Sequence, residues 1–192
     1  MNKKILISAA FIFGLSTNAF ADKMYGGIGY LKSEVNTYKY PTETYTNYDD
    51  KDNGLTLFVG YNINDNFAIE AGYNDLGETT ATINTPLTGD KDIQVLTLAG
   101  VIKSNPINKF VFFGKVGFAR IDSDEDLSNG NSYSEETTNA YYGLGVEYLV
   151  SNDLAIRLLH EDYGEDDGTT SGAAAPDRID PNATSLSIVK KF

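Results

Sequence analysis

Hydrophobic and polar residues alternate along the last ten positions of the chain. From Thr184 to Phe192, every second residue belongs to a mainly apolar face that includes Leu186 and Ile188, and the residues between them are mostly polar. A repeat of two residues predicts a β-strand with one apolar side. We therefore expect the chain to end in a strand whose last residue, Phe192, is aromatic.

Seven further stretches show the same alternation, separated by segments rich in turn-forming residues. Together they predict eight strands, at Met24–Leu31, Leu55–Asn62, Phe67–Leu76, Ile93–Lys103, Phe110–Ile121, Asn139–Leu149, Leu154–Tyr163 and Thr184–Phe192. No apolar repeat of helical period appears after residue 21. An even number of strands suits an up-and-down antiparallel barrel, whose two ends emerge on one side.

The predicted connections alternate in length. The short ones, 63–66, 104–109 and 150–153, consist mainly of Asn, Asp, Ser and Pro, which form tight turns. The long ones are 32–54, 77–92, 122–138 and 164–182. Transmembrane barrels have short periplasmic turns and long extracellular loops, whereas a soluble eight-stranded barrel gives no reason for this alternation. The sequence thus predicts an all-β, transmembrane, eight-stranded barrel.

Charge follows the same division. The four long connections hold 19 of the 27 acidic residues and 5 of the 15 basic ones. The remaining mature sequence is nearly neutral, as a wall embedded in lipid requires. There are no cysteines, so disulfides contribute nothing to stability.

Residues 1–21 have the pattern of an export signal. Lys3 and Lys4 precede an apolar run, and the small residues Ala19 and Ala21 form an A-x-A cleavage site. The run is too short for a membrane-spanning helix, which needs about 20 residues. We expect cleavage after Ala21, leaving a barrel domain at 22–192.

Within each predicted strand, one face is apolar and the other is mostly small. Four positions on the second face are charged: Glu70, Lys115, Glu147 and Arg157. The direction of the strands places all four inside the barrel, within a few residues of its periplasmic end. Two acids and two bases at one level can neutralise each other, as a dehydrated interior requires.

Several segments resemble the OmpA-like eight-stranded outer-membrane barrels. They are Gly60–Tyr73, Phe112–Arg120, Tyr142–Tyr148 and the terminal Phe192. The resemblance implies that the interior charge cluster plugs the lumen or gates a small conductance. It also implies that Phe192 is an assembly signal, read by the barrel-assembly machinery after transit with periplasmic chaperones. Lys190 departs from the family, which usually has an apolar or aromatic residue there. We expect the resemblance to cover the barrel alone, without a peptidoglycan-binding domain.

Other candidate chemistry is weak. The single histidine, His160, has no serine placed beside it as a lipid A deacylase would require, so we expect no enzyme. The segment Asp122–Asp126 copies the first ligands of a calcium loop, but Leu127 and Tyr133 stand where glycine and glutamate are needed. We expect a solvated acidic loop, with divalent-cation binding left open. We expect no cofactor, and the acidic surface argues against nucleic acid.

These patterns favour a protein of the Gram-negative outer membrane, in contact with its lipid and lipopolysaccharide. We expect a structural or surface-interaction role, in adhesion or host contact, through acidic extracellular loops. The alternatives are a low-conductance, porin-like channel gated by the interior charges and, less favoured, an outer-leaflet lipid-modifying enzyme. The sequence names no extracellular ligand.

Overall fold

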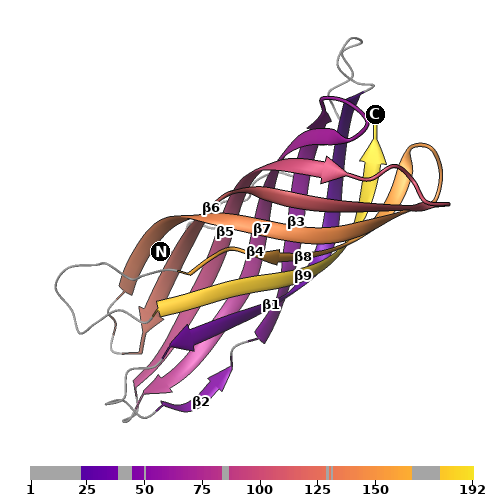
Figure 1. The fold of residues 1–192 in the computed structure, drawn as a ribbon. Coiled ribbons are helices and arrows are strands. Elements are labelled where there is room, and N and C mark those ends of the chain that lie inside the picture. Colours follow the sequence, from indigo (N-terminus) through magenta and orange to yellow (C-terminus); the bar gives the residue numbers. More distant parts are fainter. Residues whose placement is uncertain are drawn as a thin grey trace.

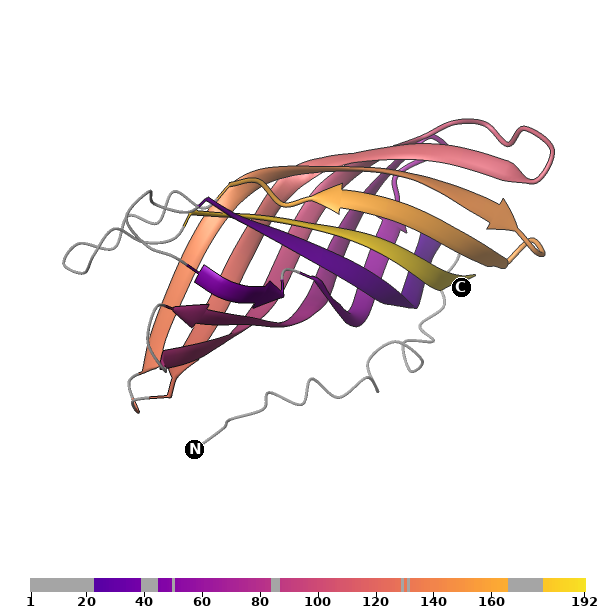
Figure 2. The ribbon, with the colours of Figure 1, turned by 90° about the horizontal axis from the view of Figure 1, so that it is seen from below.

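The strands of this chain form a tall, tilted barrel (Figures 1 and 2). The computed structural model describes residues 23–38, 45–49, 51–83, 87–128, 130, 132–165 and 178–192. The predicted export signal at 1–21 lies outside these residues. No helix within the described ranges is long and apolar enough to cross a membrane.

Eight antiparallel strands close the wall, and a ninth short strand lies outside it. The wall consists of β1 (Met24–Tyr38), β3 (Lys51–Asn62), β4 (Phe67–Ile83), β5 (Leu87–Lys103), β6 (Phe110–Leu127), β7 (Ser132–Leu149), β8 (Leu154–Asp162) and β9 (Arg178–Lys191). Their order is β4-β3-β1-β9-β8-β7-β6-β5, and pairing of β4 with β5 closes the ring. The short strand β2 (Tyr45–Asp49) pairs only with the end of β4. The predicted fold class is confirmed.

The predicted long loops were wrong in extent, because most of their described residues are strand. The β4–β5 and β6–β7 ladders continue to Ile83–Leu87 and to Asp126–Ser132. β-sheet pairing persists there because Thr and Tyr favour strands and the backbone ladder needs no apolar partner outside lipid. The segment Asp122–Asp126 therefore lies in β6 and is no loop.

The short turns lie where the sequence predicted them. In the first, the Asn64 side-chain oxygen accepts hydrogen bonds from the backbone N–H groups of Asn66 (3.0 Å) and Phe67 (2.9 Å). This closes the turn locally, a typical use of asparagine. At the third turn, Lys190 of β9 pairs with Asp153. Hydrogen bonds from Lys190 and Ser151 lower the pKa of Asp153 to about 2.

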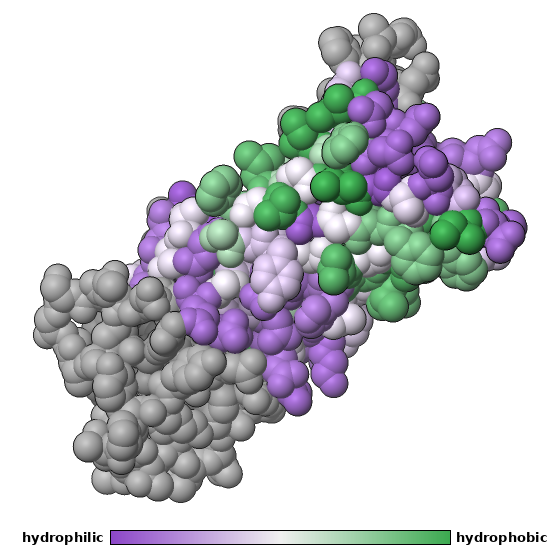
Figure 3. Space-filling model, viewed as in Figure 1, coloured by the Kyte–Doolittle hydropathy of each residue, from purple (hydrophilic) through white to green (hydrophobic). Residues whose placement is uncertain are grey.

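An apolar girdle surrounds the wall. It consists of outward-facing, exposed apolar side chains: Ile28, Tyr30, Leu55, Val59, Ile69, Leu96, Leu98, Phe112, Val116, Phe118, Tyr142, Leu144, Ile156, Leu158, Leu186 and Ile188. Figure 3 shows apolar side chains gathered in a band, with hydrophilic ones on both sides. Strands that cross a membrane need about 9–11 residues. Because β4 to β7 have 17 or 18, they extend well beyond the girdle.

The strand ends beyond the girdle, opposite the short turns, form what we call the outer rim. It comprises residues 32–38, 51–54, 75–83, 87–94, 120–127 and 132–140. Where the structure describes side chains of this rim, the outward ones are mainly polar or acidic, for example Asp92, Asp124 and Glu136. The rim therefore suits water rather than lipid.

A charge network across the barrel interior

Side chains fill the barrel interior in layers. Toward the short turns lies a cluster that includes Tyr25, Phe58 and Phe113, and toward the outer rim lies a second apolar cluster. Between and alongside them are five charged side chains, each at most 6% exposed: Glu70, Lys115, Glu147, Arg157 and Glu161. An eight-stranded barrel has an interior just wide enough for such packing.

Arg157 on β8 is the centre of the network. It is the cross-strand partner of Glu147 on β7, and its Nε and Nη2 donate to Glu147 Oε1 at 3.0 and 2.7 Å. Its Nη1 reaches across the lumen to Glu70 Oε2 on β4, at 2.8 Å. The guanidinium carbon lies 4.2 Å from the ring centroid of Phe58 and 4.8 Å from that of Phe113. Planarity lets this group bind carboxylates at its edge and aromatic rings on its face.

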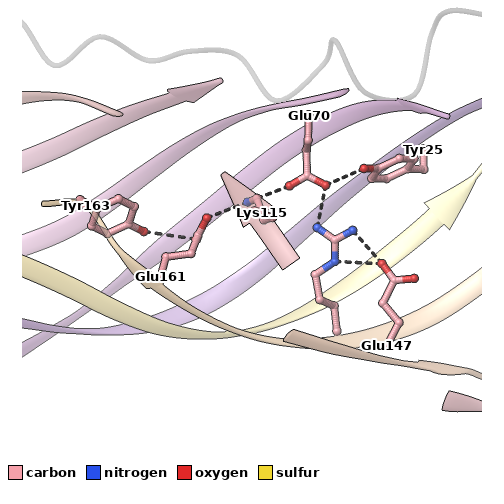
Figure 4. A network of polar contacts seen from close by, with 7 residues as sticks. Tyr25, Glu70, Lys115, Glu147, Glu161 and Tyr163 are labelled. Carbon is pink, nitrogen blue, oxygen red and sulfur yellow. Dashed lines mark hydrogen bonds and ion pairs between the residues drawn. The ribbon is translucent and has the colours of Figure 1, made fainter. Parts of the chain in front are cut away.

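Lys115 on β6 continues the network toward the outer rim. Its Nζ lies 2.9 Å from Glu70 Oε1 and 2.6 Å from Glu161 Oε1. Two tyrosines complete the chain of contacts: Tyr25 donates to Glu70 at 2.8 Å, and Tyr163 donates to Glu161 at 3.3 Å. Figure 4 shows the continuous chain of contacts from Tyr25, through Glu70, Lys115 and Glu161, to Tyr163.

Glycines make room for the aromatic rings beside Arg157. A Cβ added to Gly60 would lie 2.1 Å from Cζ of Tyr25, and one added to Gly145 would lie 2.4 Å from Cζ of Phe113. These small inward residues let neighbouring strands carry large rings at the same level. The site thus depends on where glycines interrupt the inward face.

The network stabilises the closed interior only while it is complete. Buried ions lose hydration, and pairing offsets this loss through short, charge-assisted hydrogen bonds. Three carboxylates face two cations, and Lys103 adds a third positive charge nearby, its Nζ 4.1 Å from the Tyr25 ring centroid. The arrangement can hold opposite walls together, and it offers binding groups for ions rather than an activated nucleophile.

The structure brings together all four charged residues that the sequence singled out: Glu70, Lys115, Glu147 and Arg157. Sequence reasoning missed Glu161, Tyr25 and Tyr163 as members. The alternation had already placed Glu161 on the inward face of its strand, so its charge was the available signal. The aromatic members carried no such signal, because tyrosine is equally common at membrane interfaces.

Phe192 lies apart from the network. Its backbone N–H donates to the Met24 carbonyl at 3.0 Å, and its side chain is 39% exposed. This contact places the terminal residue beside the first strand, at the end of the barrel that carries the short turns. The structure shows its position and leaves its role as an assembly signal a prediction.

A second layer of buried side chains fills the lumen beyond the network. Its apolar members include Leu31, Leu76, Ile93, Val95 and Ile121, each at most 1% exposed. Buried polar side chains lie among them, since Asn74 is the cross-strand partner of Val95 and Ser123 is that of Ile93. Ion pairs and dense, mainly apolar packing therefore fill the interior at two successive levels.

The remaining candidate sites do not join the network. His160 faces outward, and its hydrogen-bond partner among the described residues is Thr184, at 2.9 Å from Nδ1. No group of three or more potential metal ligands appears in the described part of the chain. The expectation that the protein is no enzyme stays a prediction.

Comparison with known proteins agrees with this architecture. Residues 7–192 match the model of the family described as "Outer membrane protein beta-barrel domain". A search of curated proteins found no match.

Similar solved structures share the barrel fold at low sequence identity. Ail, the attachment invasion locus protein of Yersinia pestis, is 17% identical with a TM-score of 0.58, over 89% of this chain and 99% of Ail. OprG from Pseudomonas aeruginosa is 15% identical with a TM-score of 0.63, over 90% and 96%. Neisserial surface protein A is 12% identical with a TM-score of 0.61, over 88% and 97%. The chain belongs to the outer membrane protein β-barrel domain family, and its place is the outer membrane.

Proposed function

We propose that this barrel is a surface-interaction protein, which contacts cationic groups on other cells or molecules through its outer rim. The observation that carries the proposal is the rim itself, a β-sheet wall that continues beyond the lipid girdle. On it, Asp92 of β5 stands directly opposite Glu78 of β4 on one side and Asp124 of β6 on the other. Like charges placed opposite one another destabilise a sheet, so a purely structural wall gains nothing from them.

The names of two neighbouring folds are compatible with this role. Ail is named for attachment and invasion, and the Neisserial protein for its surface location. At 17% and 12% identity, the likeness extends to the fold alone, so the proposal rests on the rim.

Charge-neutralising variants on live cells test the proposal. We expect cells displaying the wild-type barrel to bind host cells or polylysine-coated beads, and cells displaying Asp92→Asn with Asp124→Asn to bind several-fold less. The matched control is Asp65→Asn, which removes an exposed charge in a short turn at the opposite end. Equal adhesion by wild-type and double-variant cells at equal surface levels would refute the surface role.

A low-conductance channel is the second candidate, because charged side chains span the lumen. The dense packing around Leu76 and Ile93 opposes it, since both side chains are at most 1% exposed and an ion would have to displace them. Planar-bilayer recording of the wild type and Arg157→Ala decides the matter. If both are electrically silent, the channel function is excluded.

The biogenesis partners remain part of the proposal. We expect the export signal to be cleaved after Ala21, and Phe192 to be read by the barrel-assembly machinery after transit with periplasmic chaperones. N-terminal sequencing of the protein from outer membranes would reveal Asp22 as the first residue. We also propose that the protein is no enzyme: unchanged lipid A in cells overexpressing it is the expected result.

A further inference from the structure

Four residues on neighbouring strands form one polar row on the outside of the barrel. His160 of β8 is the cross-strand partner of Thr184 of β9, Thr184 is that of Lys32 of β1, and Lys32 is that of Asn53 of β3. All four side chains are exposed. Strands in a sheet lie about 4.8 Å apart, so the row is about 14 Å wide. We call it the polar row.

An apolar row lies immediately below it on the same face. Leu158, Leu186, Tyr30 and Leu55 follow the same register across the same four strands. Each of these girdle side chains is about half exposed, between 49% and 57%. Because such side chains face lipid tails, the polar row stands where the tails end and the headgroups begin.

Lys32 is a cation without a carboxylate partner among the described residues. The nearest acid on its own strand and face, Glu34, is bound by Lys51 at 3.6 Å. The comparable cation on the opposite wall, Arg120, is held by two carboxylates at 3.2 and 2.5 Å. The ammonium group of Lys32 is therefore available to an anion from outside the chain.

The neighbouring residues add hydrogen-bond donors beside this charge. His160 Nδ1 and Thr184 Oγ1 are 2.9 Å apart. If the hydroxyl donates to Nδ1, the proton on Nε2 is free to donate. If Nδ1 donates, the hydroxyl proton is free instead. Either tautomer therefore leaves one proton free to donate a hydrogen bond to a ligand. The side-chain amide of Asn53 supplies further N–H donors.

The acid nearest to the other end of the row is also engaged. Asp162, two residues beyond His160 on β8, accepts hydrogen bonds from the Tyr142 hydroxyl at 2.6 Å and from the Gly164 backbone at 3.0 Å. The row thus presents a cation and neutral donors over a lipid-facing apolar surface. Phosphate, with several acceptor oxygens and a negative charge, fits these donors.

We propose that the polar row binds the phosphate group of a lipid in the outer leaflet, whose acyl chains lie against the apolar row. The proposal rests on the outer-membrane placement of the barrel. It does not depend on Asp92 and Asp124, the acids of β5 and β6 on which the proposed surface role rests. It assigns the outer wall of β8, β9, β1 and β3 as a lipid-recognition surface.

Native mass spectrometry of the full chain in non-ionic detergent tests this, with bisphosphorylated lipid A as the probe. We expect saturable binding to the wild type and about tenfold weaker binding to Lys32→Gln, the effect of losing one charged hydrogen bond. Lys32→Arg retains the charge and is expected to keep the affinity. The matched control, Arg120→Gln, removes a cation that is already paired and is expected to bind as the wild type does.

Three results would overturn the proposal. They are equal affinity of Lys32→Gln and the wild type, equal affinity for dephosphorylated lipid A, or full competition by inorganic phosphate at the lipid's own concentration. The last would indicate a site for free anions. Heat-modifiable gel mobility verifies that each variant is folded, and His160→Gln with Thr184→Val weakens binding through a second, independent change in the row.

Discussion

Replacing Arg157 by methionine tests the interior network most directly. The change removes three charged hydrogen bonds, to Glu147 at 3.0 and 2.7 Å and to Glu70 at 2.8 Å, from a side chain that is fully buried. Two carboxylates then remain buried with less compensation. Removing one partner of a buried ion pair costs about 3–5 kcal/mol, so we expect a loss of about 4 kcal/mol in the free energy of unfolding.

Urea unfolding of the refolded barrel in lipid vesicles, followed by circular dichroism and gel mobility, measures this loss. With a slope of about 2 kcal/mol per molar urea, the midpoint falls by about 2 M. The control, Arg120→Met, breaks only exposed ion pairs and shifts the midpoint by less than about 0.5 M. A triple variant that also neutralises both carboxylates, as Glu70→Gln and Glu147→Gln, recovers much of the loss. A loss below about 1 kcal/mol for Arg157→Met would refute the reasoning.

Three shorter predictions concern the wall, the end of the chain and the rim. Gly117→Ala places a Cβ 2.0 Å from the Leu98 carbonyl oxygen, so we expect the folded, heat-modifiable form to be lost, whereas Gly114→Ala, with no atom closer than 3.5 Å, folds normally. Deleting Phe192 lowers the outer-membrane level seen in fractionated cells; a normal level would contradict its role in assembly. Slight desolvation and three nearby aspartates raise the pKa of the exposed Glu78, so its ionisation opposes folding as pH rises through that pKa. Glu78→Gln should therefore raise the thermal midpoint at pH 7 but not at pH 3.

The sequence predicted the membrane wall well, because lipid imposes a strict alternation there. Strand parity alone assigned Glu70 and Arg157 to the interior and Leu186 and Ile188 to the lipid side, and the structure confirms these faces. Beyond the girdle both faces of a strand can be polar. The alternation therefore weakens, and the segment around Asp124 resembled a loop although it continues β6.

Membership of the network was predicted only in part, for a different reason. The alternation along a strand shows whether a side chain points into the barrel. It does not show at which level along the barrel axis the side chain lies relative to other strands, because that level depends on the stagger between strands. Lys115 therefore reaches Glu161 as well as Glu70, a choice set by three-dimensional stagger. Small strands such as β2 are also invisible to periodicity, since five residues give too little of the pattern.

The seam between β1 and β9 makes the final step of folding distinctive. Tyr25 pairs with Lys191 and Tyr38 with Arg178, so this ladder joins the first and last strands of the wall along the whole of β9. Until β9 pairs with β1, one edge of β1 exposes its backbone donors and acceptors. An exposed strand edge can pair with other chains. Contacts between residues so distant in sequence also form slowly. The interval before docking is thus the period of greatest aggregation risk, and ring closure ends it.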